Sequence, residues 1–194
     1  MITPQPSNFA FIGRVWPELL IHCRNAEQSA VSNPRVAGIE ARFTLERLVD
    51  HIIEVYGLRS ASGWNLNDKL NHRSFKDRVN QRIHDKMNVL RRFGNDAAHN
   101  PDHIDPERAV RAIGQLFDIL VWAAVNVARP PLERTKLPTF DRSIVYNAPK
   151  RRQRSQQEIA AQPATPAGCQ RNRNHKTPAH RAGRNLAAET QGTP

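Results

Sequence analysis

Three predicted helix starts constrain the fold of this 194-residue chain more than any other feature of its sequence. Trp16-Pro17, Asn33-Pro34 and Asp105-Pro106 each precede a stretch in which apolar residues recur every three or four positions. Proline is favoured in the first turn of a helix, and an asparagine or aspartate before it can accept a hydrogen bond from a free backbone N–H. The sequence therefore predicts helices that begin near residues 17, 34 and 106.

The apolar residues at helical spacing identify the face that each helix is expected to bury. The expected faces are Leu19, Leu20, Cys23, Ala26 and Ala30; Val36, Ile39, Phe43, Leu48, Ile52 and Val55; Val79, Ile83, Met87 and Leu90; and Val110, Ile113, Phe117, Leu120, Val121 and Ala124. No strand-type alternation competes with these patterns. We therefore predict an all-α fold, a bundle of four to five helices over residues 1–131.

The middle of the bundle contains two further helices with recognisable ends. Asn65 is expected to cap a short helix over Leu66–Asn71, and Gly57 to end the helix before it. The next helix is expected to start at about Asp77 or Arg82 and to stop near Gly94, where glycine can adopt a positive φ.

The character of the chain changes after the bundle. Residues 132–149 are interrupted by prolines and are predicted to form an extended linker. Residues 150–194 contain nine Lys and Arg, two Glu and almost no large apolar residue, so we predict a disordered basic tail. Its cations would attract nucleic-acid phosphates, with the run Lys150, Arg151, Arg152 and Arg154 as the expected contact. The abrupt shift in composition also resembles out-of-frame translation, which would make the chain a truncated protein with a frameshifted end.

Other classes of protein and site find little support in the sequence. The N-terminus has no signal-peptide pattern and no stretch of about 18 apolar residues occurs, so we expect no membrane span and a cytoplasmic location. Two cysteines, Cys23 and Cys169, imply no disulfide framework. No phosphate-binding glycine loop appears, and we expect no cofactor. Cys169, His175 and His180 lack a partner pair of ligands, so we expect no metal site.

The stretch "RRFGNDAAHN" contains the strongest candidate site. Arg92 can bind a phosphate with two parallel hydrogen bonds, and His99 can exchange a proton near neutral pH. With Asn95 holding the imidazole or a phosphate oxygen, these groups would suffice for metal-independent RNA cleavage by attack of the 2′-hydroxyl. The alternative is structural: Arg91 and Arg92 would favour the negative end of a helix, and His99 would bond to its free carbonyls.

Four segments resemble a known family. "SNFAFIGRVWPELL", "NPRVAGIEARFTLERLVDHI", "NLNDKLN" and "LRRFGNDAAHN" together are similar to the uncharacterised helical domain at the N-terminus of type I restriction enzyme R subunits, over about Ser7–Arg129. The resemblance implies an accessory domain that precedes a nuclease and a DNA-translocating helicase. It also implies restriction-modification subunits as partners and a role in defence against foreign DNA.

That family is in turn similar to the HEPN superfamily of helical domains. Its ribonuclease members share an arginine followed after four to six residues by a histidine, which Arg92 and His99 match at the longest spacing. Active members usually have a polar residue directly after the arginine, where this chain has Phe93. This resemblance implies Arg92 and His99 as catalytic residues and pairing of two motifs in a homodimer.

Three functions follow from these observations. The leading hypothesis is a non-catalytic accessory domain of a restriction-type enzyme that docks to protein or contacts nucleic acid through Arg91, Arg92 and the basic run after residue 149. The second is a HEPN-type ribonuclease or toxin that uses Arg92, His99 and Asn95. The third is a basic protein that binds nucleic acid through its tail alone.

Overall fold

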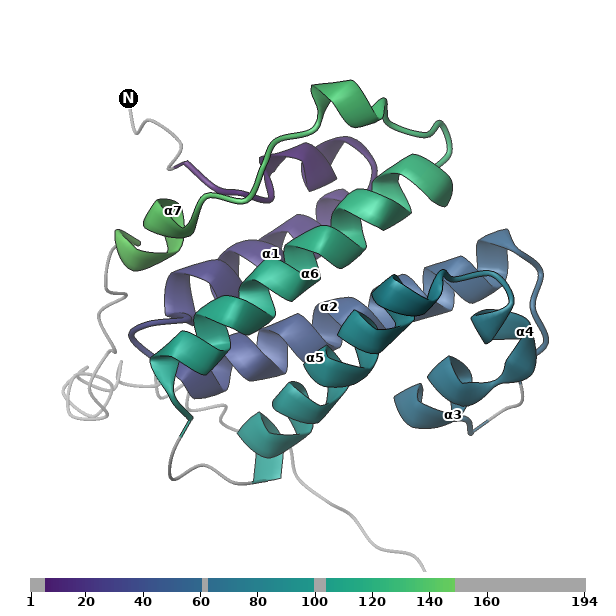
Figure 1. The fold of residues 1–194 in the computed structure, drawn as a ribbon, viewed down its shortest axis with the longest axis horizontal. Helices are drawn as coiled ribbons and strands as arrows, with labels where there is room; N and C mark the ends of the chain where they lie inside the picture. The colour runs from purple at the N-terminus through teal and green to yellow at the C-terminus, as the bar shows by residue number, and fades with distance from the viewer. Residues whose placement is uncertain (1–5, 61–62, 100–103, 149–194) are drawn as a thin grey trace, which may run out of the picture. The chain divides into compact units, whose positions relative to one another are not determined.

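The computed structural model describes residues 6–60, 63–99 and 104–148, and every regular element in these ranges is helical (Figure 1). In chain order the elements are η1 (Ala10–Arg14), α1 (Pro17–Ser29), α2 (Pro34–Val55), α3 (Leu66–Asn71), α4 (Arg73–Lys76), α5 (Gln81–His99), α6 (Pro106–Asn126), η2 (Arg134–Lys136) and α7 (Arg142–Tyr146). The predicted all-α fold is confirmed.

Local signals in the sequence located most helix ends correctly. Pro17 opens α1, and the side chains of Asn33 and Asp105 cap α2 and α6 by accepting backbone N–H groups of the first turn. Asn65 caps α3 in a reciprocal arrangement with Asp68. Gly57 follows α2 with φ +59°, a left-handed conformation that favours glycine. These ends are set by neighbouring residues, which explains why the sequence identifies them.

The four long helices form the bundle. α2 packs against α1 and against α5, and α6 contacts α1, α2 and α5 (Figure 1). The centre of the bundle is made of side chains with almost no exposed surface. The largest of them are Phe9, Phe75, Phe93, Ile12, Leu45, Leu48, Ile52, Leu70, Met87, Leu90, Ile113 and Leu116. By length and composition α6 could cross a membrane. In the structure most of its apolar residues are part of this core.

The predicted core face of α2 is partly wrong. Ile39 and Phe43 are 43% and 41% exposed and lie on the outer side of the helix. In this first half of α2 the buried side is formed by the small residues Ala37, Gly38 and Ala41. Because α2 has neighbours on several sides, small residues face the closest of them and two large apolar side chains are left outside.

The predicted end of α5 is also wrong. α5 continues through Gly94 to His99, five residues beyond the glycine that was expected to stop it. A Cβ at position 94 would overlap the Cβ of Arg42 in α2, and one at Gly38 would lie 2.5 Å from the Cβ of Ala97. Both glycines therefore let the backbones of α2 and α5 approach each other closely.

Residues 132–148 differ from the extended linker that the sequence predicted. They include η2 and α7, and Val145 of α7 is buried. Phe140 packs on Phe117 of α6 with ring centroids 5.5 Å apart. Asn8 donates to the carbonyl of Asp141 at 2.9 Å and accepts its N–H at 2.7 Å. This segment therefore belongs to the bundle; the predicted tail lies outside the described residues.

Candidate functional site

The structure places Arg92 and His99 on the same side of one helix. Both side chains are exposed on α5, where seven residues are close to two full turns and correspond to a rise of about 10.5 Å. His99 is the last residue of α5, whereas the sequence placed it beyond the helix end. Neither residue is among those that line the cavity of about 360 Å³ between α5 and α6. The two groups thus share one exposed stripe of α5.

The residues between them face different neighbours. Asn95 is half-buried and lies between Arg92 and His99 along the helix. Asp96 forms an ion pair with Arg108 of α6, whose guanidinium also lies 5.4 Å from the centre of the Phe93 ring. Phe93 itself is buried in the core. The position that is usually polar in HEPN ribonucleases therefore serves the packing of α5 in this chain.

Arg91 lies in a cluster of guanidinium groups. Burial, followed by the charges of Arg92 and Arg42, lowers the pKa of Arg91 below its ordinary value. The Nε atoms of Arg42 and Arg91 are buried and have no hydrogen-bond partner among the described residues. Like charges repel one another, and an anion bound between these groups would relieve that repulsion.

Arg35 extends the cluster along α2. Its Nε donates to the backbone carbonyl of Ala97 at 3.1 Å, which fixes the side chain across the end of α5. Arg35 and Arg42 are seven residues apart in α2 and so lie on one side of it. We call Arg35, Arg42, Arg91 and Arg92 the arginine-rich surface.

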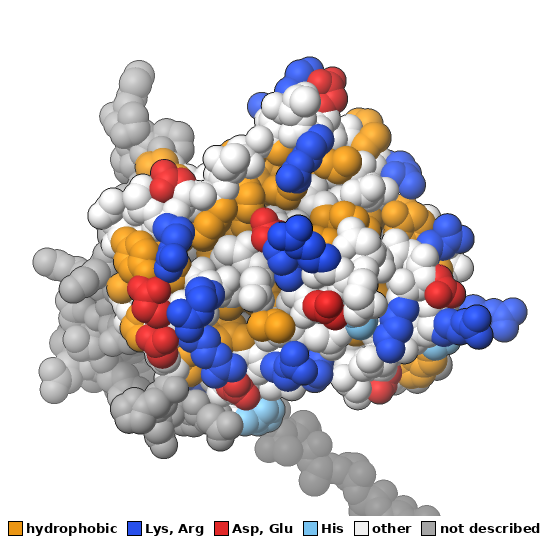
Figure 2. All heavy atoms as spheres, in the orientation of Figure 1, with side chains coloured by type: hydrophobic (Ala, Val, Ile, Leu, Met, Phe, Trp, Pro, Cys, Tyr) orange, Lys and Arg blue, Asp and Glu red, His pale blue; other side chains and the backbone are white. Residues whose placement is uncertain are grey.

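Few carboxylates neutralise this surface. Glu46 pairs with Arg42 at 3.1 Å, and within the described ranges Arg35, Arg91 and Arg92 have no carboxylate at ion-pair distance. On the face that shows α5 and α6, Lys and Arg side chains are spread with acidic groups between them (Figure 2). Three of the four side chains of the arginine-rich surface thus lack such a partner among the described residues, which suits the surface to bind phosphate groups.

The remaining predicted sites are placed as follows. Lys150, Arg151, Arg152 and Arg154, and the residues Cys169, His175 and His180 considered for a metal, lie outside the described residues. Within the described ranges, no group of three or more His, Cys, Asp or Glu side chains is arranged to hold a metal ion. Sequence reasoning missed Arg35 and Arg42, although their seven-residue spacing in a predicted helix indicates a shared face.

The fold and the surface define the class of this protein: a helical bundle domain with a cluster of arginines between two of its helices. The chain belongs to the family described as "Domain of unknown function (DUF4145)", whose model matches residues 24–153, about two thirds of its length. The match includes α2, α5 and α6, and so the whole arginine-rich surface. No curated protein and no solved structure matched the chain.

Proposed function

We propose that the bundle is a non-catalytic accessory domain of a type I restriction-type defence enzyme, and that it contacts nucleic-acid phosphates through the arginine-rich surface. The single observation behind the nucleic-acid contact is the cluster of Arg42, Arg91 and Arg92, in which the buried Nε atoms of Arg42 and Arg91 have no hydrogen-bond partner among the described residues. The restriction context rests on the resemblance of the sequence segments. Nothing in this role requires a cleft or a nucleophile.

Phosphate binding fits the chemistry of these side chains. Each guanidinium offers planar donors that match two phosphate oxygens, and the contacts read no base sequence. Binding of a helix surface to DNA phosphates releases counterions, so affinity falls steeply with salt. The proposed contact is therefore sequence-independent and salt-sensitive.

The salt dependence of DNA binding tests this proposal. In the full chain, Arg91→Gln combined with Arg92→Gln should weaken binding to a duplex and reduce the slope of log K against log salt by about 1.8, since each phosphate contact contributes roughly 0.9. The control combines Arg59→Gln with Arg73→Gln, two exposed arginines outside the arginine-rich surface that remove the same charge. Both variants keep residues 150–194, so any contribution of the basic tail cancels. Equal slopes for the two variants would contradict the proposal.

The common stripe on α5 favours a second candidate function, the HEPN-type ribonuclease. A phosphate above Asn95 would lie between Arg92 and His99, with arginine binding the phosphate and histidine moving the proton. The expected result is RNA cleavage by the full chain in the presence of a metal chelator, lost in both Arg92→Ala and His99→Ala. RNA that stays intact at high protein concentration would rule out this function and leave the accessory role unaffected.

A further inference from the structure

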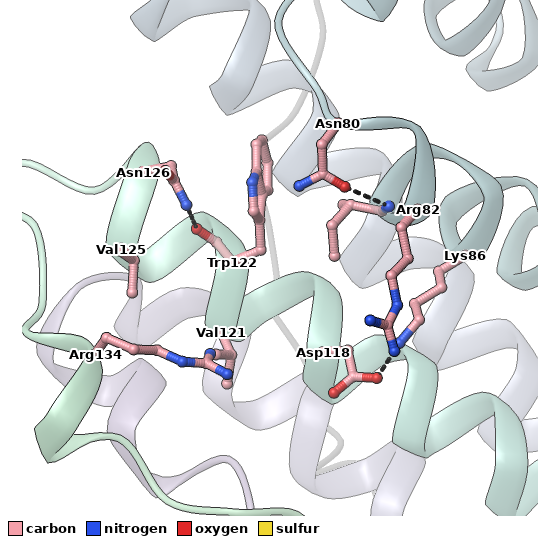
Figure 3. Close-up of a pocket in the computed structure, with 10 residues that line it drawn as sticks. Asn80, Arg82, Lys86, Asp118, Val121, Trp122, Val125, Asn126 and Arg134 are labelled. Atoms are coloured by element: carbon pink, nitrogen blue, oxygen red, sulfur yellow. Dashed lines mark hydrogen bonds and ion pairs between the residues drawn. The ribbon is translucent and has the colours of Figure 1, made fainter.

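A second feature of the bundle, a cavity, lies at the N-terminal end of α5. A cavity of about 360 Å³ is formed between the first residues of α5 and the last turns of α6, with Arg134 of η2 on its border (Figure 3). Its size is at the lower end of the range for small-molecule sites, roughly 300–1,000 Å³. No motif in the sequence indicates it, because its residues come from three separate elements.

The cavity has an excess of positive charge. Lys86 forms an ion pair with Asp118, which neutralises both groups. Arg82 and Arg134 have no carboxylate at ion-pair distance within the described part of the chain. In Figure 3 their guanidinium groups border the same opening from different sides. Two unpaired guanidiniums facing one cavity are suited to a phosphate or carboxylate.

An apolar wall lies beside these charges. Trp122 is half-buried in α6, and its indole ring stands at the border of the cavity, with Val121 and Val125 on the same helix (Figure 3). A flat ring of a ligand can stack on an indole, and such stacking on aromatic side chains is common in nucleotide sites. An inorganic anion would leave this wall uncovered.

Two amide side chains complete the border. The Oδ1 atom of Asn80 accepts the N–H of Ile83 at 3.0 Å, which leaves its NH2 group free to donate. The Nδ2 atom of Asn126 donates to the carbonyl of Trp122 at 2.7 Å, which leaves its Oδ1 free to accept. The border of the cavity thus carries one amide donor and one amide acceptor that are free to bond to a ligand.

We propose that this cavity binds a single unpaired nucleotide, with its base against Trp122 and its phosphate between Arg82 and Arg134. The nucleotide can be a free mononucleotide or an unpaired residue of a nucleic-acid chain, since both present the same base and phosphate. Arg91 and Arg92 lie in the middle of α5 and do not line the cavity, and binding here does not depend on them.

Calorimetric titration of the full chain with adenosine monophosphate tests the proposal. We expect the nucleotide to bind at least tenfold more tightly than adenosine or inorganic phosphate, because it uses the wall and the guanidiniums together. Arg82→Gln and Arg134→Gln should each weaken binding about tenfold or more, as expected for loss of a hydrogen bond to a charged group. Lys136→Gln is the matched control, since Lys136 is in the same η2 but pairs with Glu133.

A five-nucleotide single strand distinguishes the two sources. If it competes with adenosine monophosphate and depends on Arg82 and Arg134, the site accepts a nucleotide within a chain; if only the mononucleotide binds, the ligand is free. Phosphate binding as tight as that of the nucleotide, or the absence of Arg82- and Arg134-dependent binding by either ligand, would overturn the proposal. The variant with Arg91→Gln and Arg92→Gln should bind the mononucleotide normally, so failure here and failure of the proposed DNA contact are distinguishable.

Discussion

The close approach of α2 and α5 predicts an unusual response to a helix-favouring substitution. Gly94 is buried in the interior of α5, where alanine is intrinsically better than glycine by about 1 kcal/mol. A Cβ there would overlap the Cβ of Arg42 and lie 2.9 Å from its Cδ. Because a Cβ is fixed to the backbone, Arg42 cannot avoid the contact by rotating its side chain. Gly94→Ala therefore requires the two helices to separate.

The expected cost follows from these opposing terms. Inserting an extra carbon into a packed core costs about 1–3 kcal/mol, and the rigidity of this contact places it near the upper end. After the gain in helix propensity, Gly94→Ala should lower the free energy of unfolding by about 2 kcal/mol. For a domain of this size that corresponds to a decrease in Tm of roughly 4–8 °C.

Thermal unfolding followed by circular dichroism measures this effect, with Gly114→Ala as the control. A Cβ at Gly114 of α6 would lie 3.3 Å from the Cε1 atom of Phe140, an aromatic side chain that can shift slightly. We expect the control to leave Tm unchanged or to raise it. If Gly94→Ala raised Tm, the close contact between α2 and α5 would be refuted.

The double variant with Gly94→Ala and Gly38→Ala tests the same helix crossing. Its loss of unfolding free energy should be smaller than the sum of the two single losses, because the helices need to separate only once.

Three further predictions concern single side chains. Glu27 is 2% exposed and accepts two hydrogen bonds from Asn8, from its backbone N–H at 3.1 Å and from its side-chain amide at 2.8 Å. Glu27→Ala should therefore lower the free energy of unfolding, measured by urea titration, by about 2–3 kcal/mol. A smaller loss for Glu27→Ala than for Glu27→Gln would contradict this prediction. Burial raises the pKa of the Cys23 thiol from 9.0 to about 12, so this thiol favours the fold below pH about 9 and loses that effect as the pH rises toward 12. In a Cys169→Ser background, iodoacetamide at pH 8 should modify Cys23 only on unfolding, and rapid alkylation of the folded protein would disprove the burial. His99 is exposed at the end of α5, so His99→Ala should change the free energy of unfolding by less than about 0.5 kcal/mol, and a larger loss would indicate a structural role for the ring.

The chemistry of the candidate site was only partly accessible from sequence. The sequence placed His99 beyond the end of the helix, whereas α5 continues to His99, so that Arg92 and His99 lie on the same side of one helix. Sequence could not show that Arg35 and Arg42 lie against Arg91, or that Arg82, Trp122 and Arg134 share a cavity. Those groupings depend on how separate elements pack against one another, and this packing cannot be predicted from the residues near each position in the sequence.

By itself the sequence determined where most helices begin and the all-α class, because caps, prolines and apolar periodicity act within a few residues of one another. Only the tertiary structure decided which side of α2 is buried and what Gly94 does. A glycine is equally suited to end a helix or to admit a neighbouring backbone, and Ile39 and Phe43 are apolar whether or not a partner helix covers them. The choice is made by the helix that packs alongside, through contacts distant in the chain.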